Sequence, residues 1–319
     1  MRPVVAVVGS GYMGGGIAQV LALAGFEVRI ADITAEIAAA NRERLLAESA
    51  KFEAQGLFPA DSTDLLSRQL VATTIPDAVG EAGFIEEAVS ESLEVKRETL
   101  AAVSAIAPED ALIATNTSTI SITVLAEAVQ NPERFLGVHF SNPAPFIPGV
   151  ELIPHSGTAG WATDQASRIV QQTGKSAVVI RDVTGFVLNR LQYALFTEAA
   201  RIVAEGVTDA AGVDTIVRST FGFRLPFFGP FAIADMAGLD VYSLCYRQLH
   251  EAYGERFAPP EALEDLVGRG HYGSKSGGGF IAKGDEAADE LVAYRNVAYA
   301  RMAQLLQELG PSPLADQST

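Results

Sequence analysis

The sequence predicts an α/β fold whose first part is a doubly wound, largely parallel sheet and whose last part is entirely helical. Up to about residue 181, short apolar β-prone runs alternate with stretches of helical periodicity. That alternation is typical of a parallel sheet covered by helices on both faces. After residue 181, helical patterns follow one another with no strand pattern between them. We therefore divide the chain into one domain of residues 1–181 and a helical domain of residues 182–319.

The elements of the first domain follow from the local patterns. The predicted strands are Val4 to Val8, Glu27 to Ala31, Leu70 to Ala72, Gly83 to Ile85, Ala111 to Ala114, Gly137 to Phe140, Val150 to Ile153 and Ser176 to Ile180. The predicted helices are Gly15 to Ala24, Thr34 to Gln55, one that starts at Pro59, Glu94 to Ile106, Ile120 to Val129 and Thr163 to Gln172. The two helices after the second strand form an excursion from the sheet that resembles a helical hairpin.

A glycine-rich turn follows the first predicted strand, with the pattern G-x-G-x-x-G at residues 9–14. Gly9 permits a tight turn, Gly11 lets the backbone approach a pyrophosphate, and Gly14 lets the following helix pack on the strand. Asp32 ends the second strand, twenty-three residues after the first glycine, where a carboxylate can accept both ribose hydroxyls. The segment therefore predicts a Rossmann-type dinucleotide site. Since no Arg or Lys occurs in residues 33–36 to bind a 2′-phosphate, NAD is favoured over NADP.

A histidine and a glutamate, His139 and Glu151, lie in two short strand patterns joined by a Pro-rich turn. Such strands can bring their polar side chains together, and a carboxylate that holds one imidazole nitrogen leaves the other nitrogen free to accept a proton. The pair therefore predicts a general base. The alternative is a structural histidine whose polar groups are satisfied next to an apolar strand.

The helical domain shows patterns near Gly185 to Glu205, Ala210 to Thr220, Pro230 to Tyr253, Pro260 to Gly268 and Asp285 to Leu309. Its first helix has an apolar stripe that consists of Val187, Leu188, Leu191, Leu195, Ile202 and Val203. The stripe predicts a homodimer through this domain, and burial within the domain is the competing explanation. The tail beyond Pro311 is predicted to be disordered.

Composition narrows the class of protein. The 319 residues are 48% apolar and 19% charged, as in a globular protein, and no run of roughly 18 apolar residues predicts a membrane span. The net charge of −16 argues against nucleic acid and anionic membranes as partners, and it makes a highly anionic ligand less favourable. The single cysteine, Cys245, excludes an intramolecular disulfide, and we expect a buried thiol there. A strand pattern at the N-terminus leaves no room for a signal peptide, so we expect a cytoplasmic protein. We also expect no metal site.

Several motifs, taken together, resemble those of the L-3-hydroxyacyl-CoA dehydrogenase family. They are VVGSGYMGGGIA at 7–18, FIEEAVSESLEVK at 84–96, ATNTS at 114–118, GVHFSNPAP at 137–145 with Glu151, TGFVLNRL at 184–191, FFGPFAIADMAGLD at 227–240 and GSKSGGGF at 273–280. Their order and spacing match as well as their letters. Segment 185–206 is also similar to L-gulonate 3-dehydrogenase and lambda-crystallin, and the gulonate-type members also carry an arginine at the position of Arg224.

The resemblance implies roles for individual residues. His139 becomes the catalytic base, Glu151 its orienting carboxylate, Ser118 the hydroxyl near the substrate oxygen, and Asn189 the amide that completes the site. The cofactor-binding residues implied by the motifs are Gly9, Gly11, Tyr12, Met13, Gly14, Asp32, Glu91, Lys96, Asn116 and Asn142. Three assignments have alternatives that involve no chemistry: Ser118 as a helix cap, Asn189 as a partner of the backbone, and Lys96 as a solvated charge.

The substrate end departs from the acyl-CoA pattern. The helical excursion has few cations for CoA phosphates, namely Arg42, Arg44, Lys51 and Arg68. Arg224, beside a cluster formed by Phe221, Phe223, Phe227 and Phe228, can instead bind a substrate carboxylate or cover a domain junction.

These observations predict an NAD-dependent enzyme that oxidises the 3-hydroxyl of a short-chain L-3-hydroxyacyl-CoA. One alternative keeps the chemistry on a CoA-free hydroxy acid or hydroxymethyl aromatic acid, as in gulonate-, carnitine- or pyridine-carboxylate-type dehydrogenases. A 6-phosphogluconate-type enzyme is more distant, because residues 185–200 lack the lysine that it requires. A non-catalytic, crystallin-like protein is the alternative from another class.

Overall fold

The computed structural model of the chain describes residues 3–281 and 288–313. The chain forms two compact units, Met1–Ala194 and Leu195–Thr319, and each is described by itself. The division falls inside a helix, whereas the sequence pattern places the change of character at residue 181.

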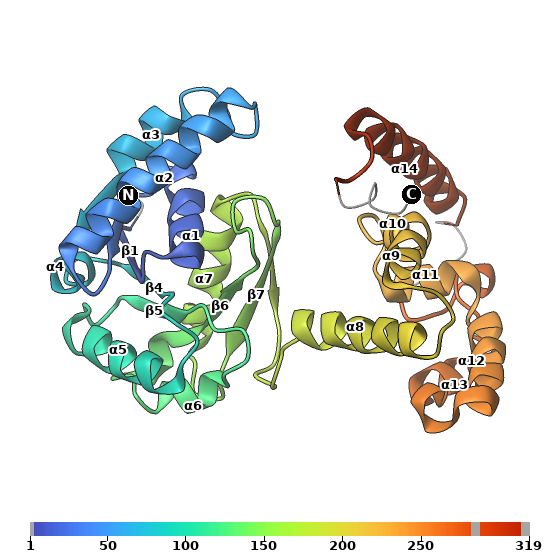
Figure 1. The fold of residues 1–319 in the computed structure, drawn as a ribbon. Helices are drawn as coiled ribbons and strands as arrows, with labels where there is room; N and C mark the ends of the chain where they lie inside the picture. Colours follow the sequence, from blue (N-terminus) through green and yellow to red (C-terminus); the bar gives the residue numbers. More distant parts are fainter. Residues whose placement is uncertain (1–2, 282–287, 314–319) are drawn as a thin grey trace. The chain divides into compact units, whose positions relative to one another are not determined.

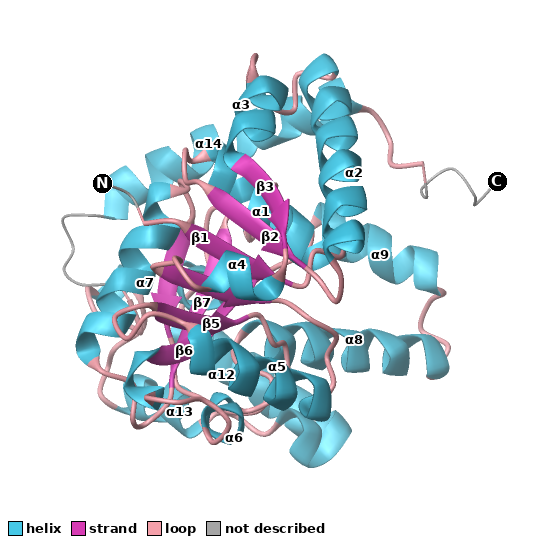
Figure 2. Cartoon of the chain, turned by 90° about the vertical axis from the view of Figure 1, so that its left-hand side faces the viewer, coloured by secondary structure: helices cyan, strands magenta, loops and turns pink. Residues whose placement is uncertain are grey.

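The first unit is built on one eight-stranded sheet (Figures 1 and 2). Its strands are β1 (Val5–Val8), β2 (Val28–Ala31), β3 (Leu70–Thr73), β4 (Phe84–Glu87), β5 (Leu112–Thr115), β6 (Phe135–Phe140), β7 (Gly149–Pro154) and β8 (Ser176–Val179). The order β3-β2-β1-β4-β5-β6-β7-β8 has parallel pairs everywhere except between β6 and β7, which are antiparallel. The carboxyl ends of β1 and β4 meet where the strand order reverses, and ligands bind at such a switch point.

Helices cover both faces of this sheet. They are α1 (Tyr12–Leu23), α2 (Ala35–Ala54), α3 (Ser62–Gln69), α4 (Ile75–Val79), α5 (Leu93–Ile106), α6 (Ile122–Ala126) and α7 (Gly160–Gln172), with a short 3₁₀ helix at Pro132–Arg134. The predicted doubly wound α/β fold is confirmed. The helix α4 was not predicted, α1 begins three residues earlier than expected, and α6 is shorter than the predicted span of 120–129. The start of α6 is set by a distant group, because Asp182 accepts hydrogen bonds from the amides of Ile122 and Thr123.

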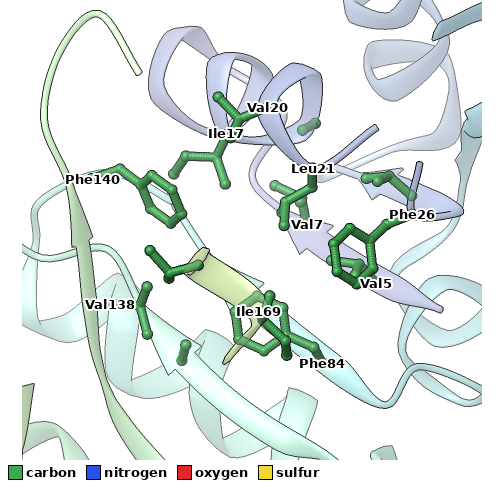
Figure 3. Packing of buried hydrophobic residues seen from close by; sticks show 14 of the residues in the cluster. Val5, Val7, Ile17, Val20, Leu21, Phe26, Phe84, Val138, Phe140 and Ile169 are labelled. Carbon is green, nitrogen blue, oxygen red and sulfur yellow. The ribbon is translucent and has the colours of Figure 1, made fainter. Parts of the chain in front are cut away.

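The core of the first unit lies on the two faces of the sheet. In β1, Val5 and Val7 enter one apolar cluster, while Ala6 and Val8 enter the other. The first cluster places side chains of α1 and α7 against the strands, as Figure 3 shows for Ile17 and its neighbours. Because a strand buried on both faces has no polar side, the sequence of β1 is an uninterrupted apolar run.

The second unit is helical throughout the residues that the structure describes. Its helices are α8 (Leu188–Ala204), which begins in the first unit, α9 (Ala210–Ser219), α10 (Phe221–Arg224), α11 (Pro230–Ala237), α12 (Leu239–Tyr253), α13 (Glu261–Gly268) and α14 (Ala288–Leu309), with 3₁₀ turns at Gly254–Phe257 and Ser274–Ser276. The helical pattern near Pro230 to Tyr253 is broken at Gly238, whose φ of 102° lies outside the helical region. The predicted C-terminal helical domain is confirmed.

Two expectations about this unit concern the burial of Cys245 and the C-terminal residues. Cys245 was expected to be buried, and this was wrong, because the thiol-bearing residue is exposed on α12. Its neighbour Leu244 is exposed as well, whereas Leu239 at the start of the same helix is fully buried. Residues 285–287 of the predicted last helix and 314–319 of the predicted disordered tail lie outside the described residues. Among the described helices, none has the length and apolarity needed to cross a membrane.

Candidate active site

The glycine turn has no room for a side chain at Gly9 and Gly14, whereas it has room at Gly11. A Cβ at Gly9, where φ is 96°, would lie 2.7 Å from the backbone of Ala88, and one at Gly14 would overlap the carbonyl oxygen of Gly9. A Cβ at Gly11 would meet no atom within 4 Å. The turn therefore leaves free space at the N-terminus of α1, where unpaired amide groups favour a phosphate.

Asp32 stands at the end of β2 beside this turn. Its Oδ2 accepts hydrogen bonds from the amide of Ser10 at 2.8 Å and from the Ser10 hydroxyl at 2.6 Å, and its Oδ1 accepts from the Ile33 amide at 2.9 Å. Partial burial by itself would raise the pKa of Asp32, but these hydrogen bonds outweigh it and hold the pKa below its usual value. The carboxylate is thus ionised at neutral pH and can accept ribose hydroxyls. Asn41 of α2, which the sequence did not single out, donates to the Ser10 hydroxyl at 2.9 Å.

His139 and Glu151 face each other across the antiparallel pair of β6 and β7. The distance from His139 Nδ1 to Glu151 Oε2 is 2.8 Å, and the histidine is buried. The other oxygen of Glu151, Oε1, accepts the amides of Val187 and Leu188 at 3.0 Å each, at the start of α8. Burial would raise the pKa of Glu151, but the hydrogen bonds from His139, Leu188 and Val187 lower it below its ordinary value. The carboxylate therefore stays ionised and fixes the imidazole.

Ser118 and Asn189 lie next to this pair. The Ser118 hydroxyl is 3.2 Å from His139 Nε2, and the Asn189 side-chain amide donates to the backbone oxygen of Ser118 at 2.8 Å. Ser118 does not cap α6, because the N-cap position belongs to Ser121. Asn189, in contrast, does satisfy a backbone group, as its alternative assignment expected, and through that bond it holds the Ser118 loop.

Glu91 and Lys96 belong to a polar network behind Ser118. Lys96 is completely buried, with Nζ 2.9 Å from Glu87 Oε1, so the idea of a solvated helix charge was wrong. Glu91 accepts hydrogen bonds from the Thr117 hydroxyl and from the amides of Ser118 and Thr119. Burial by itself would raise the pKa of Glu91. The hydrogen-bond donors and the charge of Lys96 outweigh it, so the pKa lies below its ordinary value. Glu91 therefore positions Ser118, and Lys96 is directed toward carboxylates.

The remaining predicted cofactor residues follow the carboxyl ends of β1, β5 and β6. Asn116 follows β5, and its Oδ1 accepts the amide of Phe140 at 2.8 Å, which joins the ends of β5 and β6. Tyr12 is exposed at the start of α1, and Met13 is half-buried behind it. Asn142 is exposed in the turn after β6. Tyr12 also lines a cavity of about 170 Å³ bounded by α1, α2 and the Pro-rich turn.

Two of the four cations of the helical excursion, Arg42 and Arg44, have partners within the unit. The guanidinium of Arg42 donates to the backbone oxygens of Leu70 and Ser67 at 2.7 and 2.8 Å, which joins α2 to β3. Arg44 pairs with Glu48 at 2.8 Å. Arg42 thus has a structural role that the sequence did not indicate, which makes it a poor candidate for binding a phosphate.

Arg224 lies in the second unit, exposed at the end of α10. It lines a cavity of about 420 Å³ together with Arg295, Asn296 and Tyr299 of α14, over an apolar floor that includes Ile233. No Asp or Glu is among the described residues that line this cavity. Three of the aromatic residues expected near Arg224 pack against the ring of Tyr299, which lines the same cavity, namely Phe223, Phe227 and Phe228.

Within the described residues, no group of three or more His, Cys, Asp and Glu side chains could hold a metal ion. The site therefore consists of an open glycine turn with an ionised Asp32 and, at the ends of β5 to β7, a histidine between a carboxylate and a hydroxyl.

Comparison with family models decides the assignment. Residues 4–183 match the model of the 3-hydroxyacyl-CoA dehydrogenase NAD-binding domain, and residues 185–283 match the model of the C-terminal domain of the same family. The chain belongs to the 3-hydroxyacyl-CoA dehydrogenase family. The resemblance found in its motifs is confirmed, as is NAD as the cofactor. Members of this family are oxidoreductases that act on CH–OH groups.

Individual relatives span more than one substrate. The chain is 35% identical over 275 residues to the 3-hydroxyadipyl-CoA dehydrogenase of Escherichia coli K12, a match that covers 86% of this chain and 57% of that longer protein. It is 34% identical to a probable 3-hydroxybutyryl-CoA dehydrogenase of Bacillus subtilis over 86% of this chain and 95% of that protein. A solved 5-formyl-3-hydroxy-2-methylpyridine 4-carboxylic acid 5-dehydrogenase is 31% identical, with a TM-score of 0.71 over 98% of this chain and all of that one.

Proposed function

We propose that this member of the family oxidises the 3-hydroxyl of a short-chain L-3-hydroxyacyl-CoA to the 3-keto compound, with hydride transfer to NAD and His139 as the base. One observation supports this most directly: Glu151, His139 and Ser118 form a continuous chain of short polar contacts. Two relatives with thioester substrates in their names agree with it.

Glu151, His139 and Ser118 each have a definite role in this proposal. Glu151 accepts a hydrogen bond from the Nδ1–H of His139, which assigns the tautomer and leaves Nε2 as the proton acceptor. Nε2 takes the proton of the substrate hydroxyl as hydride leaves the carbon, and the Ser118 hydroxyl holds the forming carbonyl oxygen. Asn189 keeps Ser118 in place through its backbone oxygen. The glycine turn, Asp32 and the residues near Glu91 would hold NAD, which would supply the hydride acceptor when bound.

A second candidate substrate is a hydroxy acid or hydroxymethyl aromatic acid that carries a free carboxylate and no CoA. The cavity beside Arg224 favours it, because a second arginine, Arg295, joins Arg224 there without a lining carboxylate. Paired guanidinium groups bind carboxylates in a planar, bidentate manner. The relative named for a pyridine carboxylate extends over nearly the whole chain, including α14, which carries Arg295.

The test is NADH consumption with acetoacetyl-CoA and with free acetoacetate at matched concentrations and neutral pH. The proposal expects rapid turnover of the thioester and little of the free acid. Turnover of the free acid alone would favour the second candidate, and Arg224→Gln should then raise KM for the acid, with Arg218→Gln as the control. An enzyme that binds NADH but reduces neither compound, and oxidises no hydroxy acid with NAD, would favour a crystallin-like role.

We also propose a homodimer through the helical domain, residues 182–319, of a cytoplasmic protein that binds neither nucleic acid nor membranes. In support, α8 has no buried residue, and Leu191, Leu195 and Val203 of its apolar stripe are exposed. Large exposed apolar stripes are typical of protein interfaces. Sedimentation at micromolar concentration should give a dimer, and Leu195→Glu should shift it toward monomer. A wild-type protein that sediments only as a monomer would exclude this arrangement.

A further inference from the structure

The segment that leads into α8 contacts every group that holds His139. The amides of Val187 and Leu188 bind Glu151, and Asn189 binds the loop of Ser118. At its other end the segment is anchored by Asp182, which accepts the hydroxyl and amide of Thr123. The segment is thus fixed at both ends to the first unit, and the residues between the anchors lie beside the imidazole.

Within this segment, the ring of Phe186 packs beside the ring of His139. Its side chain is fully buried in the second core cluster, and the two ring centroids are 5.7 Å apart at an interplanar angle of 56°. Its backbone has a φ of 50°, in the left-handed region that side chains other than glycine rarely adopt. The residue before it, Gly185, also has a positive φ, of 76°.

Backbone strain of this kind costs free energy and persists only where the surroundings impose it. At Phe186 they impose it from two sides. The ring is packed among buried apolar side chains, and the next two amide groups are bound by Glu151. An ordinary φ at Phe186 would redirect those amides away from the carboxylate. The strained backbone therefore lets one residue both pack against the imidazole and present the next amides to Glu151.

Hydrogen bonds alone leave the imidazole some freedom. The χ2 torsion of histidine is broad, and the contact from Nε2 to the Ser118 hydroxyl is longer than the one from Nδ1 to Glu151, 3.2 against 2.8 Å. A ring packed at an angle against the imidazole restricts this rotation. We propose that Phe186 is a positioning residue that sets the orientation of His139 for proton transfer, an inference that depends on the proposed role of His139 as the base.

Two substitutions separate the ring of Phe186 from its backbone. Phe186→Gly removes the ring but tolerates the positive φ, so the amides bound to Glu151 stay in place. Phe186→Leu keeps an apolar side chain without an aromatic plane. We expect both to lower kcat about 10- to 100-fold, the scale that misplacement of a catalytic group produces. We also expect a changed pH profile of kcat/KM with the Kd of NADH unchanged.

The matched control is Phe84→Leu, since Phe84 is as deeply buried in the same unit but belongs to the other core cluster. It should lower the Tm by a similar amount while kcat and the pH profile stay close to wild type. If Phe186→Gly and Phe84→Leu lose activity and stability in parallel, with unchanged pH profiles, Phe186 has only a structural role. Near-normal kcat in both Phe186 variants would equally overturn the inference.

His139→Gln, assayed alongside, keeps the two proposals apart. Loss of turnover in His139→Gln with normal Phe186 variants would reject only the positioning role of Phe186. Normal turnover in His139→Gln would reject the proposed base itself.

Discussion

Two glutamates on strands of the same sheet differ in what surrounds them. Glu151 on β7 receives hydrogen bonds at both carboxylate oxygens, from His139 at one and from two amides at the other. Glu86 on β4 is completely buried, and neither of its oxygens has a hydrogen-bond partner among the described residues. The pKa of Glu151 lies below its ordinary value, whereas burial first, and the neighbouring Glu87 second, raise the pKa of Glu86 well above it.

The two carboxyl groups differ both in burial, since Glu151 is only partly buried, and in the hydrogen-bond donors around them. Glu87, adjacent to Glu86 on the same strand, is equally buried but accepts hydrogen bonds from Lys96, the Thr115 hydroxyl and the Val89 amide. Donors compensate the loss of water, and a carboxyl group without donors binds a proton instead. A histidine can therefore be oriented by a buried carboxylate only where the fold supplies further donors, as the start of α8 does for Glu151.

The largest effect on turnover is expected at His139, which the ionised Glu151 orients. His139→Gln should lower turnover by about 10² to 10⁴, because general base catalysis contributes on that scale, while the affinity for NAD changes little. Steady-state kinetics and NADH fluorescence titration measure the two quantities. His155→Gln is the control, since His155 binds the backbone oxygen of Pro132 away from the site. Near-normal turnover in His139→Gln would show that the Glu151 pair is structural.

An intermediate effect is expected where a buried charge loses its partner. Lys96→Met keeps the apolar stem but leaves Glu87 without its cation, and breaking such a buried pair costs about 3–5 kcal/mol. Urea unfolding followed by circular dichroism should show this loss. If Lys96 also contacts NAD, the affinity of the folded protein for NAD should fall as well. Stability within about 1 kcal/mol of wild type would mean that the ion pair contributes little.

An effect that depends on pH is expected at Glu86, the carboxyl group without donors. Because the pKa of Glu86 is raised on folding, the folded state binds a proton that the unfolded state releases above its ordinary pKa of 4.5. The stability due to this proton is complete below pH 4.5 and declines as pH rises toward the folded-state pKa, by up to about 1.4 kcal/mol per pH unit. Glu86→Gln, which resembles the protonated group, should match wild type near pH 5 and exceed its stability near pH 8.

Unfolding midpoints across this pH range provide the measurement, and Glu98→Gln, on the exposed surface of α5, is the control. A difference between Glu86→Gln and wild type that stays the same at every pH would mean that Glu86 is not protonated in the folded protein.

The sequence by itself determined the features that depend on neighbouring residues along the chain. The apolar runs gave the strands, and the glycine turn with Asp32 indicated the cofactor site, because turn geometry and strand burial restrict residue type locally. The pairing of His139 with Glu151 was also predicted, since two strands joined by a short Pro-rich turn pair with one another in a defined register.

Tertiary structure alone decided which groups far apart in the sequence share a hydrogen bond. Asp182 sets the start of α6, and Glu151 binds the amides at the start of α8. The exposed Cys245 reversed the expectation drawn from its local pattern, and the burial of Lys96 excluded its alternative assignment as a solvated charge. Each depends on donors or apolar surfaces supplied by another element, and the free energy of a buried polar group is set by those partners rather than by its own residue type. For the same reason the sequence did not single out Glu86, which has no hydrogen-bond partner among the described residues.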